Sequence, residues 1–346
     1  MADTPRMPAA SDASAILASA THVFAAERGA RVPLVLAAPA KINLALHVVG
    51  QRADGHHLLE SLVTFTDAGD RLSLAAVEAD SFTVSGPFAG HVPVEAEGQS
   101  GNLVLKARDL LRIRLAALAL PCGPVALHLE KNLPVASGIG GGSADAAAAL
   151  TGLRRIWGQA PESDPDSAAR DLASLDLAAL GLSLGADLPM CLTGRPLIAR
   201  GIGEAITPVS GLPEFPALLV NPGVAVSTPA VFRALTEKTH PPLALPDRLA
   251  TPADWISALA KTRNDLEPPA LSLVPVIGRA RAALWDAGAA LARMSGSGAT
   301  CFGLFLDRET RDLAAERIRN AHPDWYLLSC TTRGSDPAAA ERTTTP

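Results

Sequence analysis

The sequence predicts an α+β fold, because its strand-like and helix-like segments alternate without the regular βαβ rhythm of a doubly wound parallel sheet. The 346 residues fit one large or two medium domains, and a 48% share of hydrophobic residues is enough for a substantial core. We expect a boundary within residues 201–211. This gives domains at 33–205 and 206–333, with flexible segments at 1–32 and 334–346.

The first predicted elements lie between residues 39 and 77. Hydrophobic side chains alternate with Lys41, Asn43, Ala45 and His47, which predicts a half-buried strand over 39–49 with an ammonium and an amide on its polar face. The QRADG sequence that follows indicates a turn. Residues 62–65 and 70–77 are typical of two further strands.

The remaining elements follow in chain order. Before the expected boundary, the pattern predicts a helix at 102–119, a strand at 125–130, a glycine-rich loop at 133–142 and an alanine-rich helix at 143–157. After it, the pattern predicts a strand at 217–221, a helix that opens at Thr228 with Pro229 in its first position, and a proline-rich loop at 240–247. A helical stretch begins at Asn264, and strands at 291–294 and 300–305 precede a helix at 307–320.

Composition excludes several classes of protein. A formal net charge of −5 and an aromatic content of 4% argue against a dedicated nucleic-acid binder. No segment approaches the roughly 20 apolar residues of a membrane helix, and Asp3 and Asp12 interrupt any secretory signal. Four scattered cysteines predict a reducing, cytoplasmic environment.

The most informative segment is LPVASGIGGGSADAAAAL, residues 133–150. The missing Cβ atoms of its glycines allow backbone N–H groups to close on an anion at the positive end of the following helix. Ser143 is a natural N-cap or phosphate donor. The loop lacks the lysine of a Walker A motif, and Ser143 stands where a Rossmann fingerprint has its third glycine. A flexible connector is the alternative, but the pattern favours a phosphate-binding loop.

This loop resembles the second motif of the GHMP kinase superfamily, whose members phosphorylate small metabolites with ATP. PAKINL near the start resembles the first motif, and MSGSGAT at 294–300 resembles the third. The segments GQRADGHHLLESL, LGADLPMCL, PGVAVSTPAVF and RNDLEP are similar to the branch that phosphorylates a cytidine-diphosphate-linked methylerythritol for non-mevalonate isoprenoid synthesis. The resemblance spans roughly residues 38–305. It implies a two-domain fold with the active site in the cleft between the domains, in a monomer or a homodimer.

The resemblance also implies the reacting groups. Asp187 matches the catalytic aspartate, which would take the proton of the substrate hydroxyl, and Lys41 matches a motif lysine that could polarise the attacking oxygen. Without the resemblance, Asp187 is equally well a helix cap beside Pro189, and Lys41 is a solvated lysine on a strand. The implied ATP-binding residues are Pro134, Val135, Ala136, Ser137, Gly138, Ile139, Gly140, Gly141, Gly142, Ser143 and Ala144.

Magnesium accompanies ATP in such enzymes, and Asp145 or Ser143 could bind it. A carboxylate in the first helical turn can also simply complement the positive end of the helix dipole, and we favour this role for Asp145. On the adenine side, similar residues of relatives suggest Asn102 and Lys131. We expect the third motif to lie against the phosphate region.

The implied substrate site is a cytidine pocket. His57 matches a histidine that contacts the base, Phe232 an aromatic residue that stacks on it, and Thr228 with Pro229 the adjoining wall. His56 departs from the tyrosine of many members and offers less area for stacking. Taken alone, Phe232 would be a core residue and the two histidines part of a loop.

Asn43 matches an asparagine at the substrate, and a structural amide is its alternative. Two other functions stay open: a GHMP kinase for homoserine, mevalonate or a sugar, and a non-catalytic nucleotide-binding relative. The cytidine-type segments argue against the first, and the presence of both Lys41 and Asp187 argues against the second.

Overall fold

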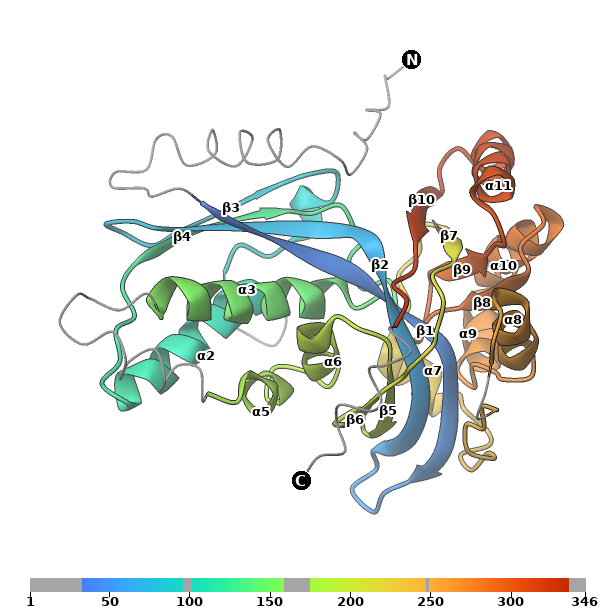
Figure 1. Cartoon of the computed structure of the whole chain (residues 1–346), viewed down its shortest axis with the longest axis horizontal. Coiled ribbons are helices and arrows are strands. Elements are labelled where there is room, and N and C mark those ends of the chain that lie inside the picture. Colours follow the sequence, from blue (N-terminus) through green and yellow to red (C-terminus); the bar gives the residue numbers. More distant parts are fainter. Residues whose placement is uncertain (1–32, 96–100, 159–174, 247–248, 336–346) are drawn as a thin grey trace.

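The computed structural model describes residues 33–95, 101–158, 175–246 and 249–335 (Figure 1). They form a six-stranded sheet and a four-stranded sheet, each packed against helices, so the expected α+β class is confirmed. The predicted extension at 1–32 and residues 336–346 of the predicted tail lie outside the described residues. Within the described part, no helix combines the length and hydropathy needed to cross a membrane.

Two long antiparallel strands organise the first sheet. β1 (Leu34–Gln51) pairs with β2 (His57–Ala76) along nearly its whole length. On its other edge, β2 pairs with β4 (Val125–Glu130) through one half and with β5 (Leu197–Gly201) through the other half. β3 (Ser81–Ser85) joins β4 in parallel, and β6 (Ala205–Pro208) joins β5. The prediction of two separate strands at 62–65 and 70–77 is wrong, because β1 spans both segments and holds them in one strand.

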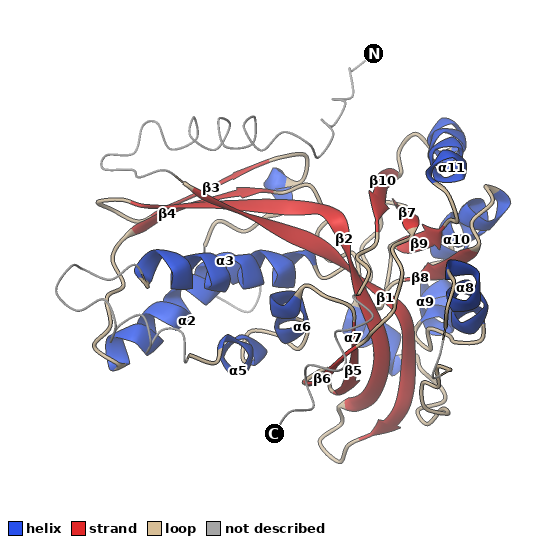
Figure 2. Ribbon diagram, in the orientation of Figure 1, coloured by secondary structure: helices blue, strands red, loops and turns tan. Residues whose placement is uncertain are grey.

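Helices cover one side of this sheet, as Figure 2 shows. They are α2 (Leu103–Ala117), α3 (Gly141–Trp157), α5 (Leu177–Leu182) and α6 (Leu188–Thr193), and a short 3-10 turn, η1 (Ala89–His91), follows β3. The alanine-rich sequence of α3 lets it pack closely, since its small side chains are buried against β1, β2 and α2.

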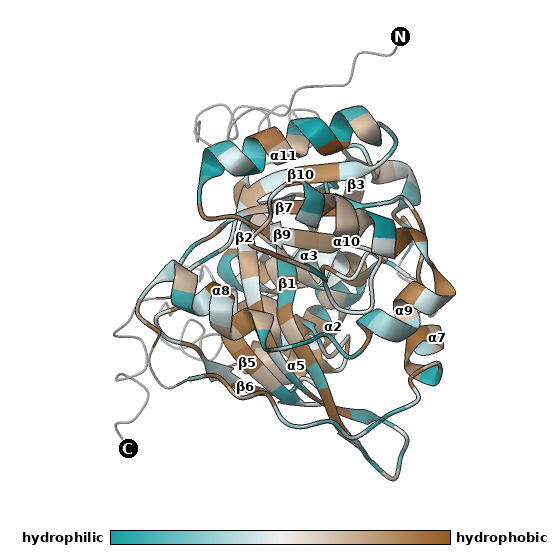
Figure 3. Ribbon diagram, turned by 90° about the vertical axis from the view of Figure 1, so that its right-hand side faces the viewer, coloured by the Kyte–Doolittle hydropathy of each residue, from teal (hydrophilic) through white to brown (hydrophobic). Residues whose placement is uncertain are grey.

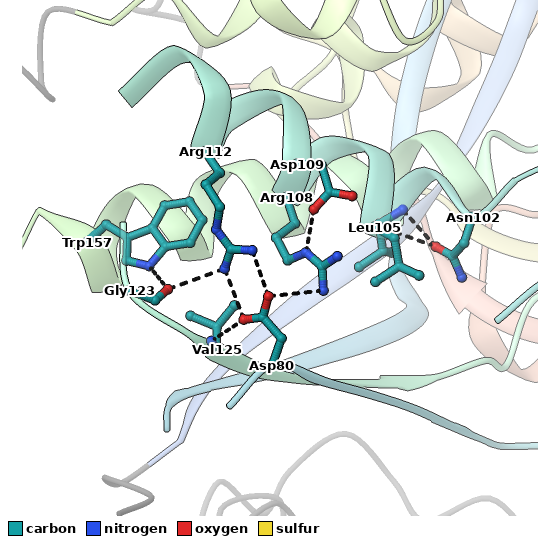
Figure 4. Close-up of polar contacts among 10 residues, drawn as sticks. Asp80, Asn102, Leu105, Arg108, Asp109, Arg112, Gly123, Val125 and Trp157 are labelled. Carbon is teal, nitrogen blue, oxygen red and sulfur yellow. Dashed lines mark hydrogen bonds and ion pairs between the residues drawn. The ribbon is translucent and has the colours of Figure 1, made fainter. Parts of the chain in front are cut away.

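A polar cluster fastens α2 to the sheet (Figure 4). Arg112 donates to both carboxylate oxygens of Asp80, at 2.6 and 2.9 Å. Its guanidinium also lies 5.4 Å from the ring centre of Trp157, at the end of α3. The planar, bidentate geometry of this arginine therefore ties α2, α3 and the segment after β2 together.

The second sheet is antiparallel in the order β10-β7-β9-β8. Its strands are β7 (Pro216–Asn221), β8 (Leu291–Met294), β9 (Cys301–Leu304) and β10 (Tyr326–Thr331). The accompanying helices are α7 (Thr228–Arg233), α8 (Pro252–Ala260), α9 (Glu267–Leu273), α10 (Val276–Asp286) and α11 (Arg308–Ala321). Figure 3 shows the largely hydrophilic α11 lying outside the hydrophobic strands.

The central part of β1 is buried on both faces, which corrects the prediction of a half-buried strand. Residues 38–48 are all buried, including Lys41, Asn43 and His47 at 3–4% exposure. The polar face is covered because the glycine-rich loop packs on Lys41, the third motif bonds the backbone of Asn43, and the proline-rich loop bonds His47. Three segments distant in sequence therefore meet on this strand.

The expected domain boundary stays a prediction. β6, which belongs to the first sheet, continues to Pro208, and the second sheet begins at Pro216. The change from one sheet to the other thus falls between these residues, just after the expected boundary at 205/206. At the start of the predicted tail, Ser335 donates its backbone N–H to Leu212 and accepts the N–H of Leu212 on its hydroxyl.

Candidate active site

The two residues expected to react are brought together. Lys41 Nζ lies 2.8 Å from Asp187 Oδ2, although 146 residues separate them in the chain. The Lys41 side chain is 5% exposed, whereas Asp187 is 39% exposed and open to a ligand. Asp187 does occupy the N-cap position of α6, as the alternative suggested, but its side chain forms no capping hydrogen bond. The carboxylate is directed to the ammonium instead.

The glycine-rich loop lies on the other side of Lys41. A Cβ at Gly140 would sit 3.1 Å from Cβ of Lys41 and 3.4 Å from its Cε, and Ile139 accepts the backbone N–H of Lys41. Gly140 has φ +68°, a left-handed conformation that favours glycine. Lys41 is therefore held between the loop and Asp187.

The start of α3 differs from its prediction. The helix begins at Gly141, two residues early, because the left-handed Gly140 ends the loop and acts as the N-cap. Ser143 consequently stands inside the first turn rather than at the cap, and its partly exposed side chain forms no hydrogen bond within the described residues. Asp145 falls in the second turn, which removes the dipole explanation for it.

The third motif packs directly on the loop, as expected. The Ser295 hydroxyl accepts the backbone N–H of Asn43 at 3.1 Å and donates to the carbonyl of Gly138 at 3.0 Å. A Cβ at Gly138 would lie 2.6 Å from carbonyl oxygens of the third motif, so only glycine permits this contact. One hydroxyl thus joins the first, second and third motifs.

The predicted base-binding residues are brought together in part. The rings of His57 and Phe232 stack with centroids 4.8 Å apart and 25° between their planes. Thr228 Oγ1 lies 2.7 Å from Ser297 Oγ, which connects α7 to the third motif. His56 lies apart: its side chain is 65% exposed and its Nδ1 is 3.2 Å from Asp54. Burial, aided by the charges of Lys238 and His56, lowers the pKa of His57 and favours its neutral form.

Two polar atoms of this region are buried without a partner. Asn43 donates through Nδ2 to Ser61 at 2.7 Å, which leaves its Oδ1 unpaired, and Nε2 of His57 is also unpaired. A buried polar atom that lacks a hydrogen bond costs roughly 1–3 kcal/mol, so such atoms mark places where a ligand or ordered water bonds. Both belong to the set predicted to bind substrate.

The two possible magnesium ligands differ in access. Lys131 Nζ donates to Asp145 Oδ2 at 2.7 Å, and the other carboxylate oxygen is buried. Mg²⁺ usually keeps several of its waters, so an enclosed carboxylate beside an ammonium does not suit it. Ser143 is only partly buried and forms no hydrogen bond within the described residues, so it fits the role better. Among the described residues, no three His, Cys, Asp or Glu side chains gather into a metal-binding group.

The residues suggested for the adenine side have structural roles here. Asn102 caps α2 by accepting the N–H groups of Val104 and Leu105 (Figure 4), and Lys131 is bonded to two buried carboxylates. Sequence reasoning missed Asp70, the second of those carboxylates, and Asn264, which donates to the carbonyls of Met294 and Gly296 in the third motif. The RNDLEP segment was the available signal for Asn264; nothing in the sequence singled out Asp70.

Comparison with known proteins agrees with this arrangement. The family profile of the GHMP kinases N terminal domain matches residues 102–195, and that of the GHMP kinases C terminal domain matches residues 247–324. A crystal structure of homoserine kinase from Cytophaga hutchinsonii shares the fold with a TM-score of 0.58 at 19% identity, over 89% of this chain and 96% of that one. The fold and the three joined motifs thus define a GHMP kinase.

More similar proteins narrow the family. The 4-diphosphocytidyl-2-C-methyl-D-erythritol kinase of Sinorhizobium medicae is 62% identical over 87% of this chain and 96% of its own length. That of Rhizobium meliloti is 60% identical over the same shares. A crystal structure of 4-(cytidine 5'-diphospho)-2C-methyl-D-erythritol kinase matches with a TM-score of 0.68 at 34% identity, over 87% of this chain and all of that one. The chain belongs to the 4-diphosphocytidyl-2-C-methyl-D-erythritol kinase family.

Proposed function

We propose that this protein transfers the γ-phosphoryl group of ATP to the 2-hydroxyl of 4-diphosphocytidyl-2-C-methyl-D-erythritol, a step in non-mevalonate isoprenoid precursor synthesis. The observation that carries the proposal is the pair formed by Lys41 and Asp187, 2.8 Å apart and beside the glycine-rich loop. Relatives above 50% identity that bear the name of this kinase support it.

Each group of site residues has a separate role in the proposed reaction. The backbone of residues 134–144 holds the ATP phosphates at the start of α3, where N–H groups and the helix dipole favour negative charge. Asp187 takes the proton of the attacking hydroxyl, and Lys41 supplies positive charge beside the moving phosphoryl group. Mg²⁺ bound with ATP would neutralise phosphate charge, and Ser143 would be its ligand from this chain.

The cytidyl end of the substrate belongs near α7. Phe232 offers the base a flat, apolar face, which the ring of His57 covers in this structure. The base therefore replaces the His57 ring on Phe232, and the unpaired Nε2 of His57 bonds to the edge of the base, while the unpaired Oδ1 of Asn43 accepts a hydrogen bond from the alcohol portion. Thr228 and Pro229 form the adjoining wall.

The test is turnover of purified protein with ATP and three alcohols. We expect ADP release with 4-diphosphocytidyl-2-C-methyl-D-erythritol and none above background with mevalonate or homoserine. Thermal stabilisation by CDP or CMP would agree with a cytidine pocket. Phosphorylation of mevalonate or homoserine alone would reject the substrate assignment, and binding of nucleotide without any turnover would favour a non-catalytic relative.

A further inference from the structure

A buried ionic cluster lies beneath the glycine-rich loop, and the mechanism above does not use it. It consists of Asp70 in β2, Lys131 just after β4, and Asp145 in α3. Lys131 Nζ donates to Asp70 Oδ2 at 2.5 Å and to Asp145 Oδ2 at 2.7 Å. None of the three side chains is more than 4% exposed. Removing these charges from water is costly, so their presence calls for a role beyond packing.

Asp70 connects this cluster to the loop backbone. Its Oδ1 accepts the N–H groups of Asn132 at 2.6 Å and Leu133 at 2.8 Å, the residues that lead into the loop. On the opposite side of the same peptide, the hydroxyl of Tyr326 donates to the carbonyl of Asn132 at 3.0 Å. Both polar groups of Asn132 are therefore fixed by side chains from distant strands.

The cluster also reaches the far end of the loop. A Cβ at Gly141 would lie 3.1 Å from Lys131 Nζ and 3.5 Å from Asp70 Oδ2, so the cluster sits directly under the junction of loop and helix. Asp145, one turn further on, accepts from the same ammonium. A single ammonium thus holds the entry and the exit of the loop at a fixed separation.

The two carboxylates that share the Lys131 ammonium have different environments. Burial opposes the charge of Lys131, yet the carboxylates of Asp145 and Asp70 leave its pKa raised. Burial raises the pKa of Asp145 well above its ordinary value, and the nearby Asp70 adds to this against the attraction of Lys131. One oxygen of Asp145 has no partner, whereas both oxygens of Asp70 are bonded. The two carboxylates are therefore unequal, and Asp70 is the one that touches the loop.

We propose that Asp70 is a positioning residue for ATP binding: it fixes the start of the glycine-rich loop through Asn132 and Leu133 and the start of α3 through Lys131. Asp70 does not touch the nucleotide and acts through the backbone. The proposal rests on the proposed function, because it assumes that the loop binds the ATP phosphates. Turnover by the wild-type protein decides that function separately, before any variant is compared.

A matched pair of substitutions tests the proposal. In Asp70→Asn, the amide nitrogen must face either the Lys131 ammonium or the two N–H groups, so one set of bonds is lost. In Asp145→Asn, the amide oxygen keeps its bond to Lys131 and the nitrogen takes the place of the unpartnered oxygen. The chemical change, burial and lysine partner are shared, and only Asp70 bonds the loop backbone.

The measurements are calorimetric affinities for a non-hydrolysable ATP analogue and for CDP, together with the melting temperature. We expect Asp70→Asn to weaken binding of the ATP analogue by about tenfold or more, while its affinity for CDP stays within about twofold of wild type. Asp145→Asn should change the affinity for each ligand by less than about threefold. A lower melting temperature with unchanged affinities, or equal losses for both ligands, would reduce Asp70 to a structural residue. Equal damage from the two variants would also overturn the proposal.

A second variant covers the case in which Asp70→Asn does not fold. Tyr326→Phe removes only the hydroxyl that bonds the Asn132 carbonyl. It should weaken analogue binding by a few fold and leave CDP binding unchanged. Unaltered analogue affinity in Tyr326→Phe, measured on a folded variant, would show that the position of Asn132 does not control the nucleotide site.

Discussion

Substitution of Asp187 by asparagine separates catalysis from structure in this site. The asparagine keeps an oxygen within reach of Lys41 but cannot take a proton. General-base catalysis contributes about 10²–10⁴-fold, so the barrier should rise by about 3–5 kcal/mol. Asparagine still accepts a hydrogen bond from the buried ammonium of Lys41, and Asp187 is 39% exposed, so the substitution should cost the fold about 1–2 kcal/mol. We therefore expect a large fall in kcat with a smaller change in stability.

The assay compares steady-state turnover, affinity for an ATP analogue and melting temperature. Asp176→Asn is the matched control, because Asp176 caps the neighbouring helix α5 and asparagine caps equally well. In Asp187→Asn, analogue affinity should stay within about twofold of wild type, since only the reacting hydroxyl loses its partner. A kcat within about fivefold of wild type would refute the role of Asp187 as the base.

Three further predictions concern other parts of the site and fold. Phe232→Ala should raise KM for the cytidyl substrate by about tenfold without changing KM for ATP, and an unchanged KM would place this ring in the core. Gly140→Ala should lower the free energy of unfolding by about 1–2 kcal/mol, because φ is +68° and the new Cβ meets Lys41 at 3.1 Å. Gly142→Ala should not, because its Cβ would lie in the first turn of α3 at an ordinary contact distance of 3.5 Å from Leu103, and equal stabilities of the two variants on chemical denaturation would contradict this. Burial is the main cause that lowers the pKa of His47, so the folded chain binds fewer protons than the unfolded chain as pH falls through about 6.5. The free energy of unfolding should therefore decrease as pH falls through this range, and it should decrease less in His47→Asn. Identical pH slopes for the two proteins would exclude this contribution of His47.

Much of the site could be identified from local sequence. The glycines at 138–142, the PAKINL strand and the LGADLPM segment are short, contiguous patterns, and each predicts a residue that the structure places beside the others. What failed was local detail. Of the two roles predicted for Ser143, N-cap or phosphate donor, the first is wrong because a left-handed Gly140 takes that position, and a backbone dihedral is not encoded by residue type alone.

The extent of burial could not be predicted in the same way. Alternation in β1 indicated one polar, open face, yet Lys41, Asn43 and His47 are all covered. The segments that bury these three side chains lie around residues 140, 295 and 241, respectively. The periodicity of one strand carries no information about contacts with segments so far away in the sequence. The same holds for Asp70, which lies in an ordinary strand and gains its role only from contact with Lys131 and Asn132.

The sequence by itself determined the α+β class, several of the main strands and helices, the three motifs and the chemical types of the reacting groups, because propensity, spacing and side-chain chemistry are local properties. Only the tertiary structure decided that an ammonium from position 41 meets a carboxylate from position 187, and that a buried ionic cluster lies under the glycine-rich loop. Such pairings depend on how the two long strands of the first sheet are covered by segments remote in the sequence, and that geometry is set by packing of the whole chain.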